Sequence, residues 1–120
     1  MKRDMDLVRK ILLAIEASPT GWAPRNPSIE GYNEWQIGYH TVLLVESGLV
    51  EGENVTGAGD QSPVAIATRL TWAGHDFLDA AREPNRWEQA RQAIAKIGGA
   101  SIQVWIGVLT KIMTNNLGLD

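Results

Sequence analysis

A helix pattern that runs directly into two strand patterns constrains the fold of this chain more than any other sequence feature. The helix is expected over residues 34–47, where Asn33 can cap the first turn and Gly48 can end the last in a left-handed conformation. Two segments that read as strands follow at 49–55 and 64–71, joined by a loop with two glycines, an aspartate and a proline. A helix that leads into a hairpin is the arrangement of a winged helix, a variant of the helix-turn-helix.

Helical patterns also flank this segment. Apolar residues recur with the helical period in residues 1–18, with Asp4 as the predicted N-cap, whereas the proline- and glycine-rich residues 19–33 predict a loop. That loop stands where a helix-turn-helix has its middle helix, so either a single turn or a variant of the fold is expected there. After the hairpin we expect three more helices, over residues 72–82, 84–97 and 102–113.

The sequence therefore predicts a mostly α-helical, winged-helix-like single domain with one small β-hairpin and extra C-terminal helices. Residues 1–82 form the predicted winged-helix core, and residues 83–120 form the C-terminal helices. A chain of 120 residues has the size of one domain with a small core.

The composition excludes several classes of protein. The chain has no cysteine, which rules out a disulfide scaffold, a cysteine-based zinc finger and thiol catalysis, and which suits the reducing cytosol. Its apolar runs are far shorter than the roughly 20 residues that cross a bilayer. We therefore expect a cytoplasmic protein that does not enter a membrane.

No motif in the sequence points to catalysis. The two histidines, His40 and His75, lack metal-site spacing and are expected to hydrogen-bond the backbone of neighbouring elements. There is no nucleophile elbow, no phosphate-binding loop and no dinucleotide-binding fingerprint. We expect no catalytic residue, no metal site and no cofactor.

Three sequence blocks resemble a known family. They are MKRDMDLVRKILLAIE at the start, IGYHTVLLVESGLVEG in the middle, and RLTWAGHDFLDAAR followed by Trp87. In this order and spacing they resemble the DUF2513 family of small uncharacterised proteins from bacteria and their phages. The resemblance implies a winged-helix-like fold and an origin in phages or prophages, and it implies no activity.

The distribution of charge bears on DNA binding, the usual role of a winged helix. Between Arg25 and Arg69 there is no lysine or arginine, and residues 26–68 carry a net charge of −6 from six carboxylates. These residues include the expected recognition helix and the hairpin, which phosphates would repel. A DNA-binding transcriptional regulator is therefore the alternative hypothesis, with nucleic acid bound through a separate basic segment that contains Arg82, Arg86, Arg91 and Lys96.

Five tryptophans favour a protein-binding role instead. Trp72 and Trp105 are expected in the core, whereas loop tryptophans either lie at an interface or fold back on the core. The leading hypothesis is a small, non-catalytic protein–protein interaction module of phage or prophage type, which modulates a host complex such as a defence system. The predicted partner-binding residues are Trp22, Trp35, Glu51, Glu53 and Asp60.

The last helix predicts self-association. Its apolar stripe is widened by Val104 and Val108 beyond what a small core needs. A twofold dimer is the commonest way to cover such a face. We expect a homodimer whose interface includes Val104, Trp105 and Val108.

Overall fold

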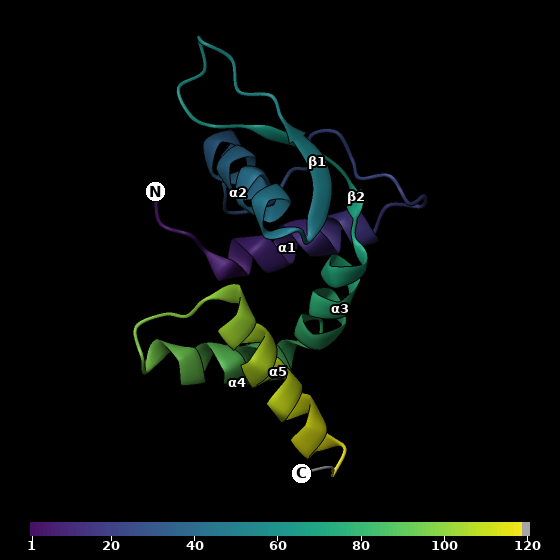
Figure 1. The fold of residues 1–120 in the computed structure, drawn as a ribbon, viewed down its shortest axis with the longest axis vertical. Helices are drawn as coiled ribbons and strands as arrows, with labels where there is room; N and C mark the ends of the chain where they lie inside the picture. The colour runs from purple at the N-terminus through teal and green to yellow at the C-terminus, as the bar shows by residue number, and fades with distance from the viewer. Residues whose placement is uncertain (119–120) are drawn as a thin grey trace. The chain divides into compact units, whose positions relative to one another are not determined.

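The computed structural model describes residues 1–118, which form five α-helices and one two-stranded antiparallel sheet (Figure 1). The predicted mostly helical fold with one hairpin is confirmed, and every element appears in the expected order. The elements are α1 (Met5–Glu16), α2 (Glu34–Ser47), β1 (Val50–Asn54), β2 (Ala65–Leu70), α3 (Trp72–Ala81), α4 (Pro84–Ala95) and α5 (Ile102–Asn116).

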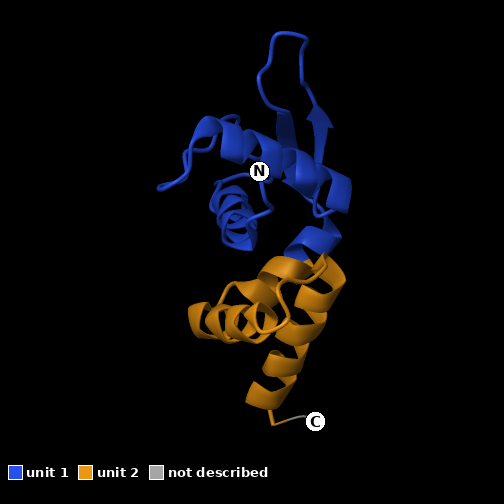
Figure 2. Ribbon diagram, turned by 90° about the vertical axis from the view of Figure 1, so that its left-hand side faces the viewer, with its two compact units in different colours: residues 1–75 blue, residues 76–120 orange. Residues whose placement is uncertain are grey.

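The chain divides into two compact units, residues 1–75 (unit 1) and residues 76–120 (unit 2), coloured separately in Figure 2. The division falls within α3. The boundary expected from the sequence, between residues 82 and 83, lies just after this helix.

Side-chain caps define the helix ends in unit 1 as predicted. The Asp4 carboxylate accepts a hydrogen bond from the backbone N–H of Leu7. At the start of α2, Asn33 and Gln36 form a reciprocal capping box with distances of 2.9 and 2.8 Å. Gly48 ends α2 with a φ of 80°, a conformation that glycine adopts without steric cost.

The core of unit 1 forms where α1, α2 and the hairpin meet. The predicted apolar stripe of α1 is buried, because residues spaced by three or four positions share one face of a helix. The helix α2 contacts α1 and both strands, which explains why it is apolar on more than one side. The largest fully buried aliphatic side chains of this core are Leu7, Ile11, Leu12, Leu44 and Val50.

The loop between α1 and α2 contains no helix. Its Ala23 N–H donates a hydrogen bond to the Thr68 carbonyl, at 2.8 Å, so the loop touches the outer edge of β2. A separate middle helix is therefore absent from the part of the chain that the structure describes. The winged-helix relationship stays a prediction.

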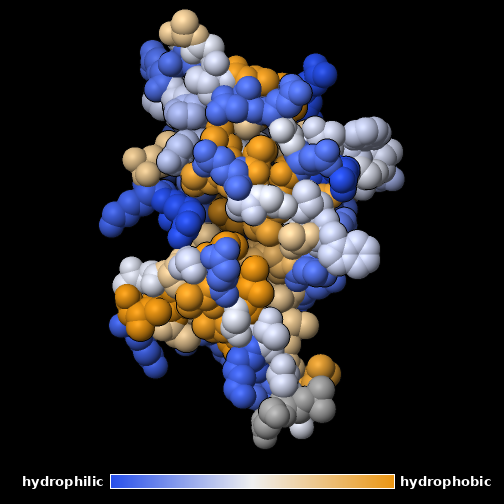
Figure 3. Space-filling model, viewed as in Figure 1, coloured by the Kyte–Doolittle hydropathy of each residue, from blue (hydrophilic) through white to orange (hydrophobic). Residues whose placement is uncertain are grey.

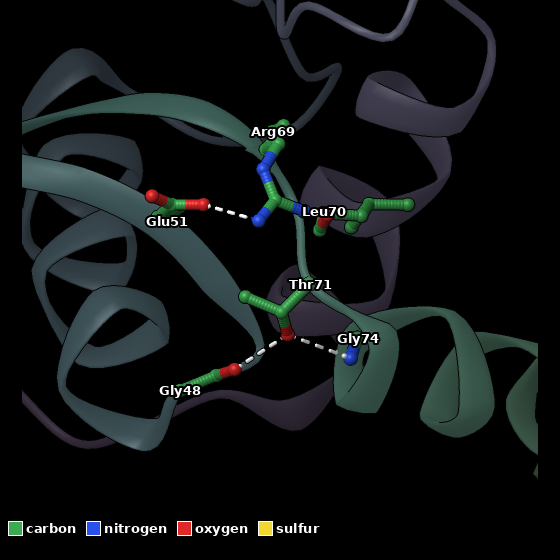
Figure 4. A network of polar contacts seen from close by, with 6 residues as sticks. All are labelled: Gly48, Glu51, Arg69, Leu70, Thr71 and Gly74. Carbon is green, nitrogen blue, oxygen red and sulfur yellow. Dashed lines mark hydrogen bonds and ion pairs between the residues drawn. The ribbon is translucent and has the colours of Figure 1, made fainter.

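Thr71 ties the end of α2 to the start of α3, as Figure 4 shows. Its hydroxyl donates to the Gly48 carbonyl at 2.6 Å and accepts from the Gly74 N–H at 3.1 Å. A Cβ on Gly74 would lie 2.0 Å from the Leu49 carbonyl oxygen, which is a steric clash. Only glycine fits at this point of α3.

Unit 2 is built around three aromatic rings. Trp87 stacks on Trp105 with ring centroids 4.5 Å apart, and Phe77 meets Trp87 edge-on at 6.3 Å. The predicted burial of Trp105 is confirmed, since 5% of the residue is exposed. The predicted burial of Trp72 is wrong, since 84% of it is exposed. At 100° per residue, Trp72 lies opposite the buried face of α3 that carries Phe77.

None of the helices among residues 1–118 combines the length and the apolar character that crossing a membrane requires.

Candidate binding groove

An open groove of about 480 Å³ lies in unit 1 between three segments. Residues 25–28 and Tyr32 come from the loop before α2, the second segment is the first half of α2, and residues 60–65 come from the hairpin loop and the start of β2. The groove therefore unites parts of the chain that are distant in sequence.

The apolar part of the groove comes mainly from α2 and the hairpin. Trp35, in the first turn of α2, is 51% exposed and lines the groove together with Ile37 and Val64. A Cβ on Gly38 would lie 3.3 Å from Val64 Cγ2, so the hairpin rests closely on α2 here. This close contact holds the hairpin side of the groove, at Val64, against α2.

Charged side chains also line the groove. Glu34 and Asp60 contribute two carboxylates, and Arg25 contributes a guanidinium. Asp60 also shapes the hairpin loop, because its carboxylate accepts the Gly57 N–H at 2.7 Å. The Thr56 hydroxyl accepts the Val64 N–H at 3.0 Å, which closes the other side of that loop.

A partly buried hydrogen-bond network centred on Asp4 holds the groove loop to α1 and α2. The Tyr32 hydroxyl donates to the Asp4 carboxylate at 3.0 Å, and the Lys10 ammonium lies 5.4 Å from the Tyr32 ring centroid. Burial raises the pKa of the Tyr32 phenol, and the carboxylates of Asp4 and Asp6 raise it further. The phenol therefore stays protonated and able to donate at neutral pH.

His40 completes this network from α2 and is 1% exposed. Its Nε2 accepts the backbone N–H of Asp4 at 2.8 Å, so Nδ1 carries the proton and donates to the Gln36 carbonyl at 2.8 Å. The prediction that His40 bonds neighbouring backbone is confirmed, whereas His75 is exposed. Among residues 1–118, no cluster of three or more histidines or carboxylates is placed to hold a metal ion.

The structure brings together two of the five predicted partner-binding residues, Trp35 and Asp60. Trp22 is 65% exposed but does not line the groove. Glu51 forms an ion pair with Arg69 across the hairpin, at 2.5 Å (Figure 4). Glu53 lies exposed on β1.

Several groove residues were not predicted from the sequence. Pro27, Ser28 and Tyr32 belong to the irregular loop, and Ser62 and Pro63 belong to the hairpin loop. The prolines mark both segments as non-helical. Only the folded chain shows that the two segments line the same groove.

The basic residues proposed for nucleic acid are largely engaged within unit 2. Arg82 pairs with Asp79 at 3.0 Å, and Arg91 pairs with Glu88 at 3.1 Å. Arg86 donates from Nε to the Ala80 carbonyl at 2.7 Å and so caps the end of α3. Lys96 is exposed. These contacts weaken the case for a basic DNA-binding face.

The three residues of the expected dimer interface differ in exposure. Val104 is 43% exposed and Val108 is half-buried. Trp105 is stacked on Trp87 inside unit 2, so its ring is not available to a second copy. The valines are the accessible part of the predicted interface.

Comparison with known proteins gives a family match. The family model described as a hypothetical protein, DUF2513, matches residues 2–101 and so ends at the residue that caps α5. An uncharacterised protein of Haemophilus influenzae is 34% identical over 95 residues, which cover 78% of this chain and 79% of that protein. No solved structure matches the chain.

Proposed function

We propose that this chain, which belongs to the DUF2513 family, binds another protein and catalyses no reaction of its own. The observation that carries the proposal is the exposure of three tryptophans in unit 1. They are Trp22, Trp35 and Trp72, which are exposed by 65, 51 and 84%.

Tryptophan has a large apolar surface, and it is enriched at protein interfaces because it buries much area with little loss of side-chain entropy. A partner that covered these side chains would remove a large apolar area from water. One of them, Trp35, lies beside a groove that is large enough to receive side chains of a partner. Apolar side chains reach the surface elsewhere too, as the orange regions of Figure 3 show.

The family resemblance supports a narrower form of this proposal. It favours a phage or prophage origin, and a target in a host complex such as a defence system. The absence of cysteine supports action in the cytoplasm.

A homodimer is part of the same proposal. The exposure of Val104 on α5 supports its place in the interface. Val108 lies one turn further along the same helix and would extend the contact. Sedimentation of the unmodified protein at tens of micromolar should give a dimer, and replacing both valines with glutamate should give a folded monomer. A monomeric unmodified protein would remove this part of the proposal.

The interaction is tested by comparing three forms of the protein as bait in its bacterial host. The forms are the unmodified chain, a variant with Trp22, Trp35 and Trp72 replaced by serine, and a matched variant with tyrosine at these positions. Quantitative mass spectrometry of the cross-linked partners should show one protein that is lost with serine and retained with tyrosine. Recovery of the same proteins by all three forms would contradict the proposal.

Nucleic-acid binding provides the second test. Because residues 26–68 are acidic and Arg82, Arg86 and Arg91 are engaged, affinity for random duplex DNA should be weaker than micromolar at physiological salt. Sub-micromolar binding that falls steeply with salt would favour the DNA-binding alternative.

A further inference from the structure

We infer that the groove binds an extended, basic segment of the partner, which pairs with the outer edge of β2 at Ala65. The inference rests on the proposed protein-binding function and names the chemistry of the ligand. Its basis is the backbone geometry of the hairpin, together with the charges that line the groove.

The hydrogen-bond pattern of the hairpin determines where the backbone of Ala65 points. Ala65 is paired with Asn54 in the register, and the Val55 N–H donates to the Val64 carbonyl at 2.9 Å. In an antiparallel pair, hydrogen-bonded and non-hydrogen-bonded positions alternate. Asn54 and Ala65 are therefore a non-hydrogen-bonded pair, and the N–H and C=O of Ala65 point away from β1 toward the outer edge of β2.

The outer edge of β2 is partly covered by the chain itself. Ala23 donates to the Thr68 carbonyl, as the first residue of a third strand would. Residues 25–28, which follow Ala23 closely in the chain, line the groove together with residues 62–65. Ala65, three residues before Thr68 on β2, lines this groove and is 8% exposed, so a segment that entered the groove would reach the edge of β2 there.

An extended segment is the occupant that this edge favours. A peptide in β conformation can pair with Ala65 and place alternate side chains toward Trp35 and Val64. An α-helix satisfies its own backbone groups, so it would leave the N–H and C=O of Ala65 without a partner.

The charges favour a basic segment. Glu34 and Asp60 line the groove beside one cation, Arg25, so the charged side chains of the groove sum to −1. Lysine or arginine side chains of the bound segment would lie near these carboxylates. Complementary charge of this kind raises the rate of association and selects among partners.

The test uses a displayed library of random short peptides, selected on the immobilised full-length protein. Peptides retained by the unmodified chain are counter-selected against Ser28→Trp, which fills the groove from an exposed position. Enriched peptides should be rich in lysine or arginine. They should bind without forming a helix, as judged by circular dichroism.

The role of charge is tested with a matched pair of double variants. Glu34→Gln with Asp60→Asn removes the two groove carboxylates, and asparagine keeps an oxygen that can accept the Gly57 N–H. Two exposed ion pairs predict about a fivefold loss of affinity, which high salt should abolish. Glu46→Gln with Glu53→Gln makes the same change in net charge outside the groove and should leave affinity unchanged.

The role of the backbone is tested by amide hydrogen exchange, measured by NMR. Bound peptide should slow exchange of the Ala65 N–H in the unmodified protein and not in Ser28→Trp.

Several results would overturn the inference: no enrichment, enriched peptides that are acidic or helical, equal effects of the two double variants, or unchanged exchange at Ala65. If the inference failed while the tryptophan-to-serine variant still lost its cellular partner, the proposed function would stand. If that variant retained every partner, the proposed function itself would fail.

Discussion

Replacing His40 with leucine should destabilise unit 1 because it removes a buried hydrogen-bond acceptor. His40 Nε2 accepts the Asp4 N–H at 2.8 Å, and leucine has a similar volume but no polar atom. An N–H left without a partner costs about 1–3 kcal/mol of folding free energy. The loss of the side-chain bond to the Gln36 carbonyl costs less free energy, because this carbonyl still accepts the helical hydrogen bond from the backbone N–H of residue 40.

Two variants separate this effect from a change in packing. In His40→Gln, the side-chain carbonyl can reach the position of Nε2 and accept from Asp4, so the loss should be well below that of His40→Leu. His75→Leu, at the exposed histidine, should change the free energy of unfolding by less than about 0.5 kcal/mol.

Urea denaturation, followed through NMR signals of α1 and α2 amides, reports on unit 1 separately. With a slope of about 1–3 kcal/mol per molar urea, the expected loss in His40→Leu lowers the midpoint by about 1 M. Equal losses in His40→Gln and His40→Leu, or a loss below about 0.5 kcal/mol in the latter, would refute the hydrogen-bond argument.

Three further predictions concern a tyrosine, two glycines and two tryptophans. Because the pKa of Tyr32 is raised in the folded state, the stability that Tyr32 contributes is present below about pH 10 and is lost as the pH rises through the folded pKa. In Tyr32→Phe, the free energy of unfolding should therefore fall less steeply above about pH 10. A slope equal to that of the unmodified protein would contradict this. In denaturant titrations, Gly74→Ala should lower the free energy of unfolding by about 3 kcal/mol or more, because the added Cβ would clash with the Leu49 carbonyl. Gly107→Ala should raise it by about 0.5–1 kcal/mol, because Gly107 lies in a helix with open space around it. Trp105→Ala should lower the free energy of unfolding by about 3–5 kcal/mol, whereas Trp72→Ala should change it by less than about 0.5 kcal/mol; similar losses would show that the aromatic stack is misplaced.

Local structure could be predicted well from the sequence because its causes lie within a few residues. The caps at Asp4 and Asn33 and the left-handed end at Gly48 each depend on neighbouring backbone groups. The burial predicted for Trp72 is wrong, although the helix that contains it was predicted correctly. Its angular position relative to Phe77 puts it on the exposed side of α3.

The candidate site could be predicted only in part, because it depends on contacts between distant segments. Trp35 and Asp60 were both expected to bind a partner, but nothing local shows that they line one groove. Arg86 illustrates the same limit. It looks like a surface cation in the sequence, and it caps the preceding helix because its guanidinium donates to the carbonyls of Asp79 and Ala80 at the end of α3.

The network around Asp4 has a consequence for how related sequences can vary. The bond to His40 uses the backbone N–H of residue 4, which every amino acid except proline supplies. The bond to Tyr32 uses the side chain of the same residue, so it requires an acceptor there. Among relatives with this fold, positions 4 and 32 should therefore change together, whereas a histidine at position 40 should tolerate any partner at position 4 except proline.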